Sequence, residues 1–290
     1  MRIAQISDFH YTHITWNPFR LFSKRILGNL NWIFSRESEF SVAQLDSLPA
    51  LFTKLGVDLV LLGGDFSTTS LLQEFESASK FVKQIKQPWI AVPGNHDHYT
   101  GAAYRDKRFY RYFANLRKKI SHPVDFFTLK DHGVEAHRIG PNWWVIALDT
   151  AHATHLFSSA GLLSEKTERY LEEIIQLLPP NDFILMLNHY PFFQNDETRR
   201  NLERGKVLQS FLKKHPRIRL YLHGHTHRRT VANLQPNDLP IVLDSGSSAE
   251  TKKGSWNLID LTDEGCSIGL YAWKNGWVNT RTEEFSWTRK

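Results

Sequence analysis

The sequence predicts an α/β fold, in which short strands alternate with helices over most of the 290 residues. Three observations lead to this prediction. Short apolar runs alternate with amphipathic stretches of helical spacing, which is typical of βαβ units with parallel strands. Several runs, such as residues 57–62, are apolar nearly throughout, as expected for strands buried on both faces. The C-terminal part is rich in strands, which adds an antiparallel or mixed portion.

The expected elements follow one another in a regular order. Strands are expected at residues 2–7, 57–62, 90–92, 143–148, 183–187, 218–222, 241–243, 255–261 and 267–273. Helices are expected from Ser41 to Gly56, where Pro49 should kink or split the helix, and over residues 71–85, 164–178 and 204–214. Because no repeat, low-complexity segment or linker interrupts this order, we expect a single domain over residues 1–290 with two inserted segments.

Composition and charge exclude several classes of protein. Hydrophobic residues make up 41% of the chain and charged residues 23%, so a disordered chain is excluded. The single cysteine, Cys266, excludes an internal disulfide and fits a reducing compartment. No apolar run approaches the ~20 residues of a transmembrane helix, and no secretory signal is visible. We therefore expect a cytoplasmic protein, either free or peripheral on the inner face of the membrane.

The chain carries a formal net charge of +6. A basic balance favours an anionic partner, which could be nucleic acid, an anionic membrane surface or a phosphorylated substrate. The alternative is that the charge serves only solubility.

Side chains that can bind metal follow five of the expected strands, at the point where each strand ends. They are Asp8 and His10, Asp65, Asn95 with His96, His189, and His225 with His227. Because ligands bind at the carboxyl ends of strands in open α/β sheets, these residues can meet in one cleft. Each has a structural explanation when taken alone, such as a helix cap for Asp8 or Asp65. Five such coincidences favour a functional site.

The residue types select the metal and the chemistry. Imidazole and carboxylate ligands together suit Mn, Fe, Zn or Co, whereas an all-oxygen shell would suit Mg or Ca. The set has too many ligands for one tetrahedral zinc, but it suits two metals bridged by one carboxylate. We therefore expect two divalent cations, with Mn²⁺ favoured and Fe or Zn as alternatives. Such a pair activates a water molecule and binds a phosphoryl group for in-line attack.

The order of the motifs resembles the calcineurin-like metallophosphoesterases. Asp-x-His, Gly-Asp, Gly-Asn-His-Asp, a strand-terminal His and Gly-His-x-His span residues 8–227, and the later Gly246-Ser247 is also similar to that family. The resemblance implies a four-layer α/β/β/α sandwich and a hydrolase of phosphoesters or pyrophosphates. It implies one metal on Asp8, His10 and His227, the other on Asn95, His189 and His225, and Asp65 as the bridge. It also implies that His96 protonates the leaving oxygen and that Asp97 orients His96.

The residues after Asp65 depart from the family pattern. Many members carry a further Asp or Asn there, whereas this chain has Phe66-Ser67-Thr68. No expected metal ligand is lost, so the departure concerns substrate contacts rather than the metals.

Two segments rich in basic and aromatic residues are the clues to the substrate. Residues 11–38 follow the first expected ligands and residues 102–130 follow Asp97, so both are expected at the rim of the site. Their composition suits either a membrane-facing edge or a cap that packs on the core and solvates its charges. Single-stranded nucleic acid ranks third, and no nucleic-acid partner is expected. The candidate substrate contacts are Arg20, Lys24, Arg25, Trp32, Arg105, Arg108 and Arg111.

Residues 22–32 are similar to the chlamydial-type UDP-2,3-diacylglucosamine pyrophosphatases of lipid A synthesis, a membrane-associated group of this family. This resemblance implies hydrolysis of UDP-2,3-diacylglucosamine to UMP and 2,3-diacylglucosamine 1-phosphate. The alternatives are a soluble phosphodiesterase for cyclic nucleotides or glycerophosphodiesters, and a non-catalytic scaffold. The filled ligand set argues against the scaffold, and the sequence leaves the oligomeric state open.

Overall fold

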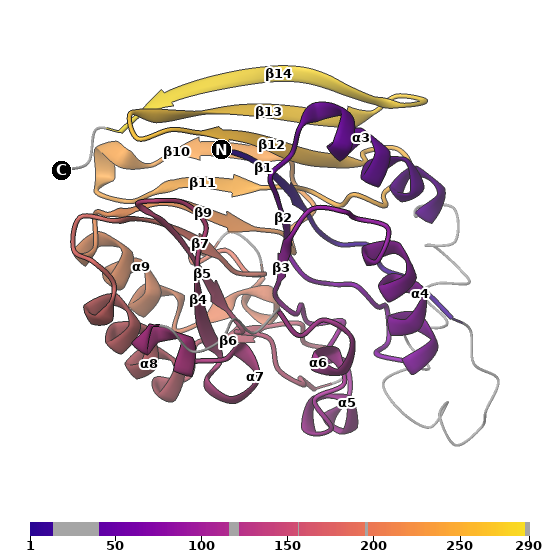
Figure 1. The fold of residues 1–290 in the computed structure, drawn as a ribbon. Helices are drawn as coiled ribbons and strands as arrows, with labels where there is room; N and C mark the ends of the chain where they lie inside the picture. The colour runs from indigo at the N-terminus through magenta and orange to yellow at the C-terminus, as the bar shows by residue number, and fades with distance from the viewer. Residues whose placement is uncertain (14–40, 116–121, 156, 195–196, 288–290) are drawn as a thin grey trace.

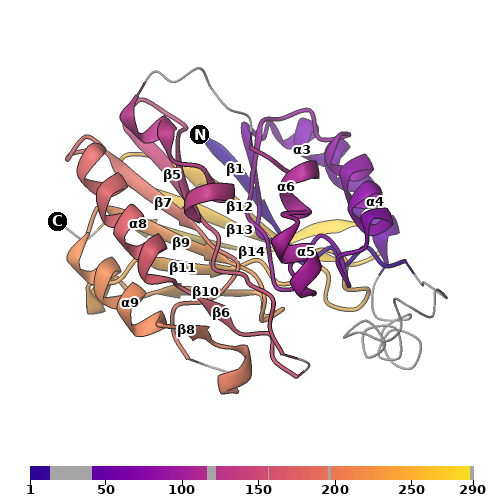
Figure 2. The ribbon, with the colours of Figure 1, turned by 90° about the horizontal axis from the view of Figure 1, so that it is seen from below.

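The computed structural model describes residues 1–13, 41–115, 122–155, 157–194 and 197–287. Two six-stranded sheets pack face to face, and helices cover their outer sides (Figures 1 and 2). The predicted α/β fold, with sheets flanked by helices, is confirmed. Within the described ranges, no helix has the length and apolar character needed to cross a bilayer.

The first sheet combines a parallel half with an antiparallel half. Its strand order is β14-β13-β12-β1-β2-β3, with β1 parallel to β2 and β2 parallel to β3. The strands are β1 (Arg2–Ile6), β2 (Leu59–Leu62), β3 (Trp89–Ala91), β12 (Ser255–Leu261), β13 (Gly265–Trp273) and β14 (Trp277–Ser286). The strands predicted at residues 255–261 and 267–273 therefore extend this sheet by antiparallel pairing, as the sequence predicted.

The second sheet has a parallel centre and antiparallel edges. Its order is β10-β11-β9-β7-β5-β4. The strands are β4 (Val134–Arg138), β5 (Trp143–Leu148), β7 (Phe183–Leu187), β9 (Ile218–His223), β10 (Thr230–Asn233) and β11 (Ile241–Asp244). A separate pair, β6 (Gly161–Leu162) and β8 (Leu202–Glu203), lies outside both sheets.

Strand β5 shows how the second sheet divides the core. Successive side chains of a strand point to opposite faces, so Trp143, Val145 and Ala147 pack toward the first sheet. Trp144, Ile146 and Leu148 pack on the other face, against α8 (Glu165–Leu177) and α9 (Gly205–Lys214). Because both faces are buried, the strand appears in the sequence as a continuous apolar run.

The helix expected from Ser41 to Gly56 is split, as Pro49 predicted. Residues Val42–Ser47 form a 3₁₀ helix and Leu48–Leu55 form α3, with Pro49 in its first turn. Gly56 ends α3 in the left-handed conformation with φ of 66°, which glycine adopts without a steric penalty. Helix α4 (Leu72–Val82) follows and covers the first sheet beside α3 (Figure 2).

Five strands and several short helices were not predicted from the sequence. Strand β14 is an exposed edge with polar and charged residues, while β6 and β8 have two residues each, so none presents an apolar run. The unpredicted elements are β4, β6, β8, β10 and β14, with α5 (Gly101–Arg105), α6 (Phe109–Tyr112), α7 (Leu129–His132) and 3₁₀ turns at Pro123–Phe126, Thr198–Arg200 and Gln235–Asn237.

Candidate metal centre

All seven predicted metal ligands meet at the carboxyl ends of parallel strands from both sheets. They follow β1, β2 and β3 of the first sheet and β7 and β9 of the second. We call this set the ligand floor: Asp8, His10, Asp65, Asn95, His189, His225 and His227. Because the two sheets pack face to face, residues separated by more than 200 positions in the chain lie side by side.

One cluster of the ligand floor contains Asp8, His10 and His227. The Nε2 atom of His227 lies 3.1 Å from Asp8 Oδ1 and 3.3 Å from His10 Nε2. The distance from His10 Nε2 to Asp8 Oδ1 is 3.8 Å. Ligand atoms that share a cation at ~2.0–2.2 Å lie roughly 3 to 4 Å apart, so these three atoms are spaced to hold one metal.

A second cluster contains Asn95, His189 and His225. Asn95 Oδ1 lies 2.9 Å from His225 Nδ1 and 3.3 Å from His189 Nε2. Asp65 stands between the clusters, because its Oδ2 is 3.5 Å from His189 Nε2 and 3.9 Å from His10 Nε2. This is the arrangement that a carboxylate bridging two cations requires.

Backbone carbonyls determine which histidine nitrogens can bind a cation. The Gly63 carbonyl lies 2.8 Å from His189 Nδ1 and accepts its proton, so Nε2 is the nitrogen that faces Asp65 and that a cation would bind in place of a proton. The Arg200 carbonyl does the same for His225 Nε2 at 2.9 Å, which leaves His225 Nδ1 facing Asn95. The donor set therefore fits a pair of cations, and its tautomers are set for ligation.

The electrostatics of the floor also favour bound positive charge. Burial would raise the pKa of Asp8, but the charge and hydrogen bond of His227 lower it to about 2. Burial would lower the pKa of His189, but Asp65 raises it to about 9. Burial, together with the charge of His189, lowers the pKa of His225 to about 3, which keeps this ring neutral and its lone pair available to a cation. Burial would also raise the pKa of Asp65, but the charge of His189 lowers it, so both buried carboxylates remain ionised and attract cations.

The backbone of the floor is strained. Among the described residues, Asp8, His10, Asp65, His225 and His227 have φ between 50° and 68°, in the left-handed region that residues with a side chain rarely adopt. Such conformations cost about 1–3 kcal/mol each and persist where the surrounding structure enforces them. The bends turn five of the seven ligands away from the strand direction and toward one point.

Gly94 allows the loop after β3 to approach Asp65. A Cβ atom at residue 94 would lie 2.1 Å from Asp65 Oδ1 and 2.6 Å from Asp65 N, which is closer than atoms can pack. The same approach lets the His96 N–H donate to Asp65 Oδ1 at 2.8 Å. Only glycine therefore permits the contact that holds the bridging carboxylate.

His96 lies at the edge of the floor with its ring fixed. Its Nδ1 is 2.6 Å from the Thr68 carbonyl and donates to it, which leaves Nε2 as the nitrogen that can exchange a proton with a substrate. The ring stacks on Tyr99 with centroids 5.5 Å apart. It also lies near enough to His10 and Asp65 for a nitrogen to approach their ligand atoms within 4.8 Å.

The contacts of Asp97 differ from the predicted orienting role. Its carboxylate accepts hydrogen bonds from the N–H groups of Phe66, Ser67 and Gly94 at 2.9–3.2 Å. Thr68, rather than Asp97, thus holds the His96 ring. Burial and the nearby charge of Asp65 raise the pKa of Asp97 to about 6. Asp97 joins the loop after β2 to the loop after β3 and so positions His96 indirectly.

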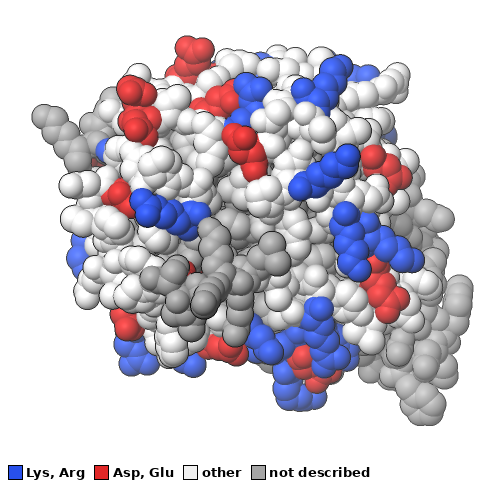
Figure 3. All heavy atoms as spheres, viewed as in Figure 1, with Lys and Arg blue, Asp and Glu red and all other residues white. Residues whose placement is uncertain are grey.

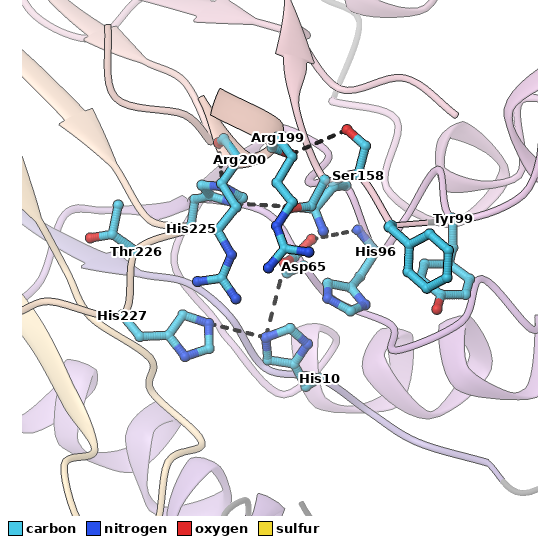
Figure 4. Close-up of a pocket in the computed structure, with 13 residues that line it drawn as sticks. His10, Asp65, His96, Tyr99, Ser158, Arg199, Arg200, His225, Thr226 and His227 are labelled. Carbon is cyan, nitrogen blue, oxygen red and sulfur yellow. Dashed lines mark hydrogen bonds and ion pairs between the residues drawn. The ribbon is translucent and has the colours of Figure 1, made fainter. Parts of the chain in front are cut away.

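A cavity of about 350 Å³ opens above the floor (Figure 4). Its other side is formed by residues 157–162 and 197–203, which we call the β6–β8 wall. Residues that line the cavity but were not predicted as site residues are Tyr99, Phe157, Ser158, Ser159, Arg199, Arg200 and Thr226. The Arg199-Arg200 pair could have been found, since its segment leaves the sheet at the same edge as His189.

The predicted substrate contacts have a different placement. Arg20, Lys24, Arg25 and Trp32 lie outside the described residues. Arg105 and Arg111 are exposed, and Arg108 donates to the Ser70 carbonyl and to Asp106. None of these three is among the described residues that line the cavity. On the face seen in Figure 3, basic and acidic side chains are interspersed, and the cluster at the lower edge, where Figure 1 places α5, contains both kinds.

The geometry agrees with a comparison to known families. Residues 1–229 match the model of the calcineurin-like phosphoesterases. The chain belongs to this family. It is thus a metal-dependent hydrolase of phosphoesters, and the family and the two ligand clusters together indicate a dinuclear site for divalent cations.

Related proteins share the family and the fold at low identity. The chain is 25% identical over 228 residues to a 3′,5′-cyclic-nucleotide phosphodiesterase of Nostoc sp., covering 78% of this chain and 71% of that one. It is 24% identical over 174 residues to a probable glycerophosphodiester phosphodiesterase of Arcobacter nitrofigilis, covering 59% and 57%.

Two solved structures share the architecture. A dimetal phosphatase of Danio rerio has a TM-score of 0.68 at 12% identity, and 99% of each chain is covered. A purple acid phosphatase of Lupinus luteus has a TM-score of 0.65 at 10% identity, covering 98% of this chain and 53% of that one.

Proposed function

We propose that the protein hydrolyses a phosphodiester or pyrophosphate bond whose phosphoryl group lies over Asp65, between the two ligand clusters. The observation that carries the proposal is the position of Asp65, which lies within 4 Å of one histidine from each cluster. Divalent cations at such a site supply an activated water molecule and neutralise phosphoryl charge. Asp8, His10 and His227 would hold one cation, and Asn95, His189 and His225 the other.

His96 supplies the remaining chemical need, which is a proton for the leaving oxygen. Histidine titrates near neutral pH and can donate a proton in the transition state. The Thr68 carbonyl holds one nitrogen, so the proton to be transferred resides on Nε2. The ring lines the cavity beside His10 and Asp65, where a leaving group can reach it.

Two classes of substrate are candidates. Small phosphodiesters, such as cyclic nucleotides and glycerophosphodiesters, are supported by the names of the relatives from Nostoc and Arcobacter. A lipid-linked sugar nucleotide, UDP-2,3-diacylglucosamine, is supported by the basic and aromatic residues 11–38 and by their resemblance to membrane-associated members. In that case the enzyme would act at the inner face of a membrane.

A substrate panel distinguishes these candidates. The purified chain, loaded with Mn²⁺, is supplied in parallel with bis(p-nitrophenyl) phosphate, cyclic AMP, glycerophosphodiesters and UDP-2,3-diacylglucosamine in mixed micelles. Turnover of the first substrate is expected for either class, and kcat/KM among the others identifies the class. Absence of turnover of every substrate with Mn, Fe and Co supplied would overturn the proposal.

A further inference from the structure

The β6–β8 wall presents two arginines to the ligand floor. Arg199 and Arg200 line the cavity together with His10, Asp65 and His227. In Figure 4 both side chains extend from the wall toward the side of the cavity where His10 and Asp65 lie. A substrate bound over Asp65 would therefore lie between the floor and two guanidinium groups.

Main-chain hydrogen bonds fix the position of this pair. His225, a floor residue, donates from Nε2 to the Arg200 carbonyl at 2.9 Å. The Arg199 carbonyl accepts from the Ser159 N–H at 2.9 Å, and the Tyr190 hydroxyl donates to the Ser159 carbonyl at 3.0 Å. Since Tyr190 follows His189 directly, the wall is tied to both histidines of the second cluster.

The charge at the cavity exceeds what a simple diester needs. The floor contributes the two carboxylates of Asp8 and Asp65, and two divalent cations would leave it with net positive charge. A phosphodiester has a single negative charge, which such a floor neutralises by itself. Arg199 and Arg200 add two permanent charges, of which that of Arg199 is shared with Glu197, whose side chain is 64% exposed and screened by solvent. A ligand with further negative charge matches this arrangement.

We propose that Arg199 and Arg200 bind a second phosphoryl group, adjacent to the one over Asp65. Guanidinium groups bind phosphate through paired, charge-assisted hydrogen bonds, so two of them form a specific phosphoryl subsite. The substrate class is then a pyrophosphate diester. In its hydrolysis, water oxygen bonds to one phosphorus and gives up a proton, and the bridging P–O bond breaks. The bridging oxygen keeps the bond's electron pair and leaves on the second phosphoryl group, as a phosphomonoester that can take up a proton from His96. This inference rests on the proposed function.

A binding experiment tests the subsite without turnover. With Mn²⁺ present, isothermal titration measures Kd for α,β-methylene-UDP, which has two phosphoryl groups, and for UMP, which has one. Arg199→Gln and Arg200→Gln should each weaken binding of the diphosphate about tenfold, while Kd for UMP changes less than about threefold. Arg281→Gln is the matched control, because Arg281 is exposed on β14 and pairs with Glu283.

Two results would overturn the inference. One is an equal loss of affinity for both ligands, which would place the arginines on the phosphoryl group over the floor. The other is unchanged affinity for both, with thermal unfolding showing that the variants are folded. Hydrolysis of bis(p-nitrophenyl) phosphate reports separately on the proposed function: wild-type turnover with either of these binding results rejects the subsite and keeps the hydrolase.

Discussion

The ligand floor and the β6–β8 wall face each other across one cavity but are built differently. Five of the seven floor residues are buried, and the floor lies at the ends of strands of the two six-stranded sheets, with left-handed bends that direct its side chains. The wall rests on two strands of two residues, and Phe157 and the Arg199 side chain on it are 70% and 54% exposed. The carboxyl ends of sheet strands, which are rigid, thus support the proposed chemistry. Loops, which tolerate changes of sequence, support the choice of substrate.

Neutralising the bridge should have the largest effect on the floor. Asp65→Asn keeps the shape of the side chain but removes the charge shared by both clusters, so cation binding and water activation should both fail. We expect kcat/KM for bis(p-nitrophenyl) phosphate to fall at least about 1,000-fold, equivalent to roughly 4 kcal/mol, with loss of bound Mn measured by mass spectrometry. Glu197→Gln on the wall is the control and should retain full metal content. An Asp65→Asn protein with two metals and normal turnover would contradict the bridging role.

Removing the proton donor should have the next largest effect, a fall in kcat. His96→Ala should lower kcat about 100-fold or more while both metals remain, because the ring acts on the leaving group. The loss should be smaller for p-nitrophenolate, which leaves without protonation, than for an alkoxide leaving group. Metal content that falls in step with activity would show instead that His96 is a ligand.

The approach of Gly94 to Asp65 tests how closely the floor is packed. Gly94→Ala should reduce the free energy of unfolding by about 3 kcal/mol, because its Cβ would overlap Asp65. Gly101→Ala is a matched control, since a Cβ there meets no atom within 4 Å. Urea unfolding compares the two variants. Equal stability would mean that the loop after β3 moves to accept the Cβ atom and that the floor is not closely packed at Gly94.

A buried carboxylate below the floor gives a pH-dependent stability. Glu74 accepts hydrogen bonds from the N–H groups of Thr69 and Leu71, in the loop after Asp65, and burial raises its pKa from 4.5 to about 7. The folded protein therefore binds a proton on Glu74 more tightly than the unfolded chain does. The protonated carboxyl stabilises the fold fully below pH 4.5, and this stabilisation is lost as the pH rises through 7. Between pH 5 and pH 8 the free energy of unfolding should fall by roughly 2.5 kcal/mol from this group.

Glu74→Gln provides the comparison for that pH dependence. Its stability in urea should be lower at pH 5, because an amide cannot replace every hydrogen bond of the carboxyl, but it should vary less between pH 5 and pH 8. Parallel curves for the two proteins would show that Glu74 ionises normally in the folded state.

The smallest expected effect concerns the wall alone. Tyr190→Phe removes the hydroxyl that donates to the Ser159 carbonyl. This hydrogen bond should contribute about 1 kcal/mol to the free energy that holds the wall in position. Because the floor is untouched, KM should rise about fivefold while kcat and metal content stay constant. A loss of metal in this variant would show that wall and floor form a single unit.

Most of the parallel strands could be predicted because each is buried on both faces. Residues 143–148 and 183–187 appear as continuous apolar runs, and the structure has strands with the same bounds. Strand β14 was missed because one face and an edge are exposed, so its polar residues have no apolar run to mark them. The two-residue strands of the wall depend on each other and on Tyr190 for their position. These contacts join residues far apart in the chain, so no local sequence pattern predicts them.

The sequence by itself determined the positions of the metal-competent side chains. Strand ends that carry Asp, Asn and His are a local signal, since strand burial and loop chemistry both depend on neighbours in the chain. Only the tertiary structure decided the distances among them and the Thr68 contact of His96. It alone placed Arg199 and Arg200 opposite Asp65, because these relations depend on how two sheets and a separate strand pair pack together.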